Sequence, residues 1–200
     1  MKPHYARIAI AVALVALIAI VIGAFAQTYG GDDNVAAVAP LGPCPERFLD
    51  QVGQAARIRE RLASLPEGRA LLDDLPVEVR FCFGEIEVPV VSEDRLLLMD
   101  RRADLAEQTA RAGHLLHHVV VGLPFPDAIA VDADCEAIVD AAVEREAGAY
   151  SVEVRLRRAQ NQTTARYEFE PGFWAAPEPE REALVARYLR EHPGGAPHID

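Results

Sequence analysis

Hydrophobic and polar positions divide the chain into an apolar N-terminal segment, a short polar connector and a longer region with helix and strand patterns. Residues 8–26 form an unbroken apolar run behind two basic residues. At a rise of ~1.5 Å per residue, a helix of this length crosses a hydrocarbon layer ~30 Å thick. The basic residues place the N-terminus in the cytoplasm and the rest of the chain outside. We therefore predict a transmembrane anchor or signal peptide over residues 1–26 and a linker over 27–43.

The pattern leaves open whether this segment stays attached to the domain. The motif Ala24-Phe25-Ala26 fits a signal-peptide cleavage site, and cleavage after Ala26 would make the protein secreted. The apolar run is longer than the usual ~7 to 15 residues of a signal peptide, which favours a retained anchor in the inner membrane. Both interpretations place the domain on the extracytoplasmic, periplasmic side.

The remaining pattern predicts one α+β domain over residues 44–192, followed by a tail over 193–200. Apolar residues recur at three- and four-residue steps in the helical segments and alternate in the strand segments. Three consecutive strands predict a small antiparallel sheet packed with helices. The predicted strands are 77–83, 85–91 and 95–100, and the predicted helices are 45–65, 66–75, 103–121, 134–158 and 179–192.

Composition and charge restrict the partners and suggest a disulfide. The chain has 31 acidic and 20 basic side chains and a formal net charge of -11. Nucleic acid is therefore not expected as a partner, because phosphate binding requires a clustered cationic face. An exported domain lies in an oxidising compartment, where three cysteines allow one disulfide. Because Cys82 lies in a predicted strand, we expect Cys44 to pair with Cys135.

Three of the six histidines, His114, His117 and His118, lie within five positions of a predicted helix. Residues four apart in a helix stand on the same face, so His114 and His118 point to one place. Two histidines with this spacing form the metal-binding half of the HExxH pattern. On the next helix, Glu146 lies in an otherwise apolar stripe, where a carboxylate requires a metal, a histidine or an arginine as partner.

The order of these elements resembles the core of zincin-like metallopeptidases of the gluzincin type, over about residues 66–158. In that family one helix carries HExxH and a downstream helix supplies a glutamate as the third zinc ligand. The resemblance implies a zincin-like core with zinc bound by His114, His118 and Glu146. Leu115 occupies the position of the catalytic glutamate, and losing a general base costs about 100- to 10,000-fold in rate. It therefore implies a degenerate metallopeptidase, a pseudoenzyme without efficient peptidase activity.

Three other residues could support such a site. Glu107 lies seven positions before His114 and is the nearby carboxylate that could replace the missing base, while His117 and Tyr150 are candidates for contacts behind the ligands. The alternatives remain that the histidines form a solvated polar face and that Glu146 pairs with an arginine. The protein would then be a metal-free binding or scaffold module of the envelope, with another envelope protein as partner, on the same or an unrelated α+β fold.

Overall fold

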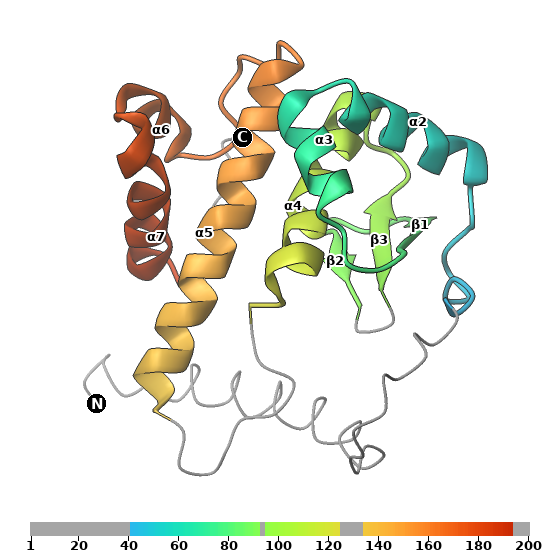
Figure 1. The fold of residues 1–200 in the computed structure, drawn as a ribbon, viewed down its shortest axis with the longest axis horizontal. Helices are drawn as coiled ribbons and strands as arrows, with labels where there is room; N and C mark the ends of the chain where they lie inside the picture. Colours follow the sequence, from blue (N-terminus) through green and yellow to red (C-terminus); the bar gives the residue numbers. More distant parts are fainter. Residues whose placement is uncertain (1–40, 93–94, 125–133, 194–200) are drawn as a thin grey trace, which may run out of the picture. The chain divides into compact units, whose positions relative to one another are not determined.

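The computed structural model describes residues 41–92, 95–124 and 134–193 (Figure 1). The predicted N-terminal segment 1–26 lies outside these residues, as does all but the end of the predicted linker. Within the described ranges, no helix is long and apolar enough to cross a membrane. The fold is α+β, as the sequence predicts, and its elements lie close to the predicted positions.

The first two helices of the described residues pack against each other and close one side of the main core. Helix α2 (Val52–Ala63) and helix α3 (Pro66–Asp73) are separated by a short turn. Pro66 begins α3 because proline lacks the N–H group that the first turn of a helix leaves unpaired. Ile58 and Leu62 of α2 are fully buried and join the main core beneath the helices.

The sheet is mixed, and the prediction of an antiparallel sheet was wrong. Strands β1 (Arg80–Gly84), β2 (Val90–Val91) and β3 (Leu96–Asp100) lie in the order β1-β3-β2. Strand β3 pairs with β1 in parallel and with β2 antiparallel. The chain after β1 passes to the far edge before it returns through the centre, and an alternating pattern identifies strands without specifying their neighbours.

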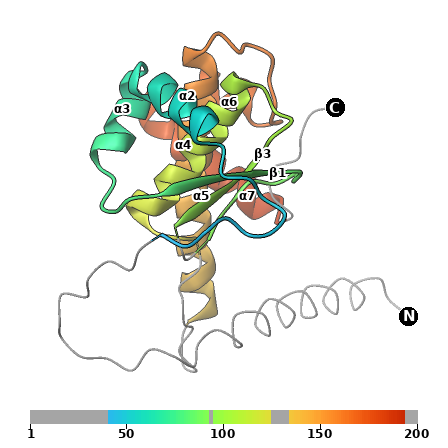
Figure 2. The ribbon, with the colours of Figure 1, turned by 90° about the vertical axis from the view of Figure 1, so that its right-hand side faces the viewer.

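The disulfide joins Cys44 to Cys82, not to Cys135 as predicted. Successive side chains of a strand point to opposite faces, so Cys82 faces away from its neighbours Phe81 and Phe83. The segment before α2 passes along this opposite face, shown in blue in Figure 2, and brings Cys44 to it. Cys135 is exposed in the first turn of a later helix. Membership of a strand therefore did not exclude Cys82 from pairing.

Two long helices form the centre of the molecule. Helix α4 (Leu105–Val121) begins where the Asp104 side chain accepts a hydrogen bond from the Glu107 N–H, and α5 (Cys135–Ala159) is capped by Asp134 in the same way. Figure 1 shows α5 between α4 on one side and the C-terminal helices on the other. The pairing of α4 with α5 positions the candidate site.

The C-terminal segment forms a second, smaller core against α5. It contains α6 (Glu170–Ala175), which the sequence pattern did not predict, a short 3-10 turn (Glu178–Glu180) and α7 (Arg181–Glu191). Tyr167 and Phe169 stack on each other and are buried against α5 and α7. These aromatic side chains therefore bind the end of the described chain to the central helix.

Candidate metal centre

Helix α4 packs against the main core with one face and against α5 with another. Leu115 and Leu116 are buried in the main core. The backbone of α4 approaches α5 closely at Gly113, where a Cβ atom would lie only 2.1 Å from the Cδ1 atom of Leu156. This close approach allows side chains of α4 and α5 to meet at the next turn, where the histidines lie.

The structure brings His114, His118 and Glu146 together. The Nε2 atoms of the two histidines are 3.3 Å apart. The carboxylate of Glu146 on α5 reaches both rings, with Oε2 3.5 Å from Nε2 of His114 and Oε1 3.4 Å from Nε2 of His118. The three side chains thus offer ligand atoms from two helices, all within 4.8 Å of one another. Such a cluster could hold a metal ion.

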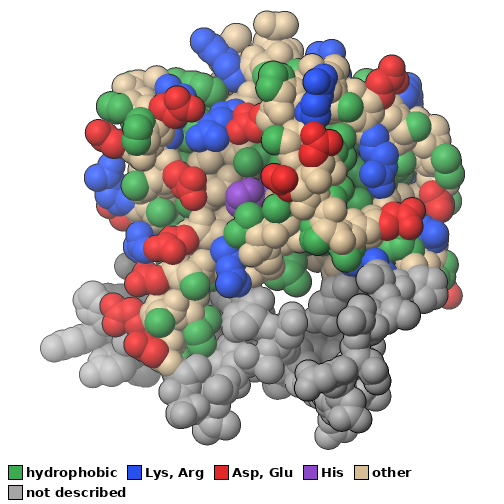
Figure 3. All heavy atoms as spheres, in the orientation of Figure 1, with side chains coloured by type: hydrophobic (Ala, Val, Ile, Leu, Met, Phe, Trp, Pro, Cys, Tyr) green, Lys and Arg blue, Asp and Glu red, His purple; other side chains and the backbone are tan. Residues whose placement is uncertain are grey.

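The cluster is enclosed on the protein side and open on one side. The His118 side chain is 4% exposed, whereas the Glu146 side chain is 32% exposed. Figure 3 shows one histidine at the surface of the face drawn there, with acidic side chains nearby. Solvent and small ions therefore have access to the cluster from the Glu146 side.

Proton binding follows from the same contacts. Burial lowers the pKa of His114, but its contacts with Glu146 and Glu153 outweigh this effect and raise the pKa to about 9. Burial raises the pKa of Glu146, but its contacts with His114 and His118 lower it to about 2. Without a metal, the cluster therefore holds a proton as an ion pair around neutral pH, and a metal ion must displace that proton.

A second carboxylate lies behind His114. Oε2 of Glu153 is 3.1 Å from Nδ1 of His114, on the side of the ring away from the cluster. Burial raises the pKa of this carboxyl, but His114 and the Tyr167 hydroxyl lower it to a net value below the ordinary range. Glu153 was not among the residues predicted from the sequence, although it lies two helical turns after Glu146 on the same stripe of α5.

The three predicted supporting residues have different surroundings. The ring of Tyr150 packs edge-on against His114, with centroids 4.8 Å apart. His117 lies over Gly148, where a Cβ atom would be 2.6 Å from its Nε2 atom. Burial, followed by the charges of His118 and His114, lowers the pKa of His117 to about 4. Tyr150 therefore contacts His114 of the cluster, and His117 lies beside the cluster.

Glu107 is not at the cluster. Its carboxylate forms ion pairs with Arg111, Arg157 and Arg166, which come from α4, α5 and the segment before α6. These pairs connect α4 to the C-terminal half of the domain. Glu107 therefore holds these arginines together, and the structure does not place it where it could replace the missing base.

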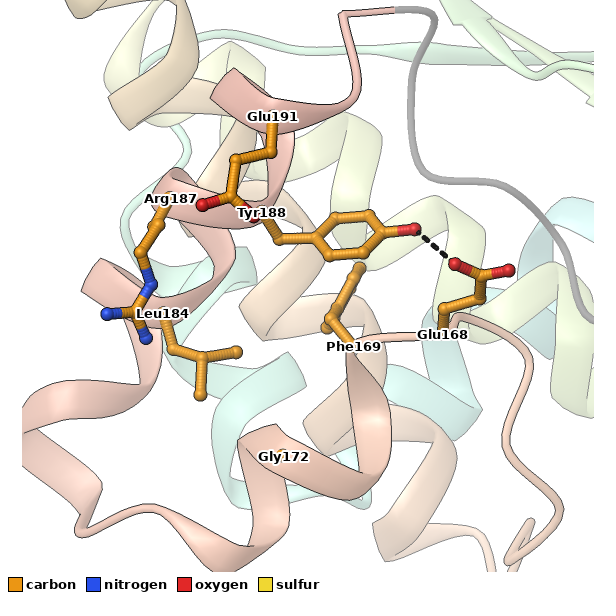
Figure 4. Close-up of a pocket in the computed structure, with 7 residues that line it drawn as sticks. All are labelled: Glu168, Phe169, Gly172, Leu184, Arg187, Tyr188 and Glu191. Carbon is orange, nitrogen blue, oxygen red and sulfur yellow. Dashed lines mark hydrogen bonds between the residues drawn. The ribbon is translucent and has the colours of Figure 1, made fainter.

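A separate pocket of about 180 Å³ lies between α6 and α7. Figure 4 shows Tyr188 in this pocket, with its hydroxyl donating a hydrogen bond to Glu168. Phe169 forms part of the wall. None of the lining residues belongs to the histidine cluster, so the pocket does not extend the candidate site.

The chain matches no protein-family model, no curated protein and no solved structure. The resemblance to zincin-like metallopeptidases therefore rests on the residues and their arrangement.

Proposed function

We propose that this protein is an exported metal-binding domain in which His114, His118 and Glu146 bind zinc. The observation that carries the proposal is the meeting of two imidazole nitrogens, 3.3 Å apart, with one carboxylate, whose two oxygens lie 3.5 Å and 3.4 Å from them. In a tetrahedral zinc site, nitrogen and oxygen ligands lie ~2.0 to 2.2 Å from the metal, which separates them from one another by about 3.3 to 3.5 Å. The two imidazole nitrogens therefore have the separation of two such ligands, and the Glu146 carboxylate lies close enough to supply a third.

The donor types and the exposure also support zinc. Two histidines and one glutamate are the ligand set of zinc sites that keep a fourth position for water or substrate. The exposed side of Glu146 leaves room for that position. A zinc ion in such a site acts as a Lewis acid and promotes ionisation of water. His114, His118 and Glu146 would bind the ion, and the buried His118 side chain would exclude solvent on its side.

We further propose that the domain is a degenerate, zincin-like metallopeptidase without efficient peptidase activity. In the HExxH pattern the residue after the first histidine supplies the general base. That residue is Leu115, which is 3% exposed and packs in the main core. Glu107 is held by three arginines and does not substitute for it.

The disulfide supports the proposed location. Stable disulfides occur mainly in proteins outside the cytoplasm. The Cys44–Cys82 bond joins the start of the described domain to its sheet. Together with the apolar run of residues 8–26, it favours a domain held at the inner membrane and facing the periplasm.

Metal content of the purified protein tests the proposal. After equilibration with zinc and removal of the excess, elemental mass spectrometry should find about one zinc per chain, because the three ligands form one site. His114→Ala should abolish this zinc. His192→Ala is the matched control, since His192 is exposed at the end of α7 and contacts Tyr188. Wild-type protein without zinc would refute the proposal.

The contacts within the cluster also favour a second candidate function. His114 and Glu146 satisfy each other as an ion pair when no metal is bound. A domain stabilised in this way could act as a metal-free binding or scaffold module with an envelope protein as partner. Zinc-free protein that is equally stable with and without added zinc would favour this alternative.

A further inference from the structure

We propose that Glu153 is a positioning residue of the metal site, acting through His114, and that Tyr167 holds Glu153 in place. This inference rests on the proposed zinc site and assigns the residues that determine how firmly one ligand is held. The three side chains form a chain of contacts, from the His114 ring to the Glu153 carboxylate and from that carboxylate to the Tyr167 hydroxyl.

The first step concerns the proton on the His114 ring. A neutral imidazole carries one N–H group and one lone pair, and only the nitrogen with the lone pair can bind a metal. Glu153 lies 3.1 Å from Nδ1, while Nε2 is the atom that faces His118 and Glu146. A carboxylate beside Nδ1 favours the proton on that nitrogen. It therefore leaves the lone pair on Nε2, which points into the cluster.

The second step concerns the burial of Glu153. Its side chain is only 4% exposed, and a buried carboxylate is costly unless both oxygens have partners. Oε1 accepts a hydrogen bond of 2.6 Å from the Tyr167 hydroxyl, and Oε2 faces His114. Tyr167 is itself buried and stacked on Phe169. The carboxylate is thus fixed by the C-terminal segment in the orientation that His114 requires.

The two histidines differ in this respect. Neither buried Nδ1 atom has a hydrogen bond of standard geometry among the described residues, but a carboxylate oxygen of Glu153 lies 3.1 Å from Nδ1 of His114, and no such ion pair is found there at Nδ1 of His118. Support from a carboxylate is therefore specific to His114, and its removal should weaken one ligand without removing the site. Carboxylates behind ligating histidines commonly contribute about 10- to 100-fold to metal affinity.

Cobalt binding to full-length variants tests this role, because visible absorption of bound Co²⁺ reports the ligand arrangement directly. Glu153→Ala removes the acceptor and should weaken Co²⁺ binding by about 100-fold. Glu153→Gln keeps a neutral acceptor and should weaken Co²⁺ binding by about 10-fold. Tyr167→Phe should weaken Co²⁺ binding by no more than Glu153→Gln does. All three should alter the absorption spectrum of the bound ion, which a loss of stability alone would leave unchanged.

Glu107→Gln is the matched control, because it also removes a buried charge that joins α4 to α5 but lies in the arginine cluster. Its Co²⁺ affinity and spectrum should match those of the wild type. If Glu153→Gln and Tyr167→Phe also bind Co²⁺ like the wild type, the positioning role is wrong while the metal site stands. Wild-type protein that binds no Co²⁺ and no zinc would overturn the metal site and this inference with it.

Discussion

Replacing Leu115 with glutamate recreates the HExxH pattern in the sequence, but the structure predicts that the substitution destabilises the domain. Leu115 is 3% exposed and packs with the core beneath α2 and α3. A glutamate at this position would place its carboxyl group among apolar side chains. The missing base is therefore not restored by one substitution, because the position after the first histidine faces the core.

The expected loss has two parts. Removing a buried leucine from a packed core costs about 2 to 5 kcal/mol. A buried carboxyl whose pKa rises from ~4.3 to above 7 adds about 1.4 kcal/mol for each pH unit above its unfolded pKa, or about 4 kcal/mol near pH 7. The sum of about 6 to 9 kcal/mol is comparable with the whole stability of an ordinary domain, about 5 to 15 kcal/mol.

Denaturant unfolding as a function of pH separates these two parts. Burial raises the folded-state pKa of the introduced carboxyl group. The cost of its charge is therefore absent below its unfolded-state pKa and grows as the pH rises. Leu115→Glu should therefore be less destabilised near pH 5 than near pH 8, whereas Leu115→Gln should show the same deficit at both. Leu115→Met, which conserves volume, should cost less than about 1.5 kcal/mol. A glutamate variant as stable as the methionine variant at both pH values would refute the assignment of this position to the core.

Three further predictions concern the surroundings of the site. Burial lowers the pKa of His114, but its two glutamate partners raise it to about 9. In the presence of a chelator, the stabilisation from these partners is therefore complete below about pH 6.5 and is lost as the pH passes about 9. The free energy of unfolding measured in urea should fall over that range more for the wild type than for His114→Gln. Cys44→Ser should lower the free energy of unfolding by about 3 to 4 kcal/mol, because the bond to Cys82 closes a long loop. Cys135→Ser should change it by less than about 0.5 kcal/mol, since Cys135 is exposed. Equal losses in the two variants would contradict the observed pairing. Gly113→Ala should destabilise the domain by about 1 to 3 kcal/mol despite the better helix propensity of alanine, because the added Cβ atom meets a leucine of α5. If thermal unfolding showed this variant to be more stable than the wild type, the close approach of the two helices would be contradicted.

Helix positions could be predicted from the sequence because their signals are local. The periodic pattern and the caps at Asp104 and Asp134 determine where α4 and α5 begin. The direction and order of the strands depend on the path of the chain between them, which alternation does not encode. Pairing of Cys82 was missed for the same reason, since it depends on which segment passes the outer face of the sheet.

The candidate site was predictable to the extent that helical spacing determines it. His114 and His118 share a face because they are four residues apart, and Glu146 stood out as a carboxylate in an apolar stripe. Glu153 continues that stripe but was not considered. The surroundings of Glu107 could not be predicted, because two of its arginine partners lie 50 or more residues away in the sequence.

Anomalous diffraction at the zinc absorption edge, from crystals grown with zinc, tests the proposed site most directly. We predict one anomalous peak within about 2.0 to 2.2 Å of Nε2 of His114, Nε2 of His118 and a carboxylate oxygen of Glu146. Density at this position without an anomalous signal, or zinc peaks only elsewhere on the molecule, would contradict the account and leave the cluster as an ion pair between two helices.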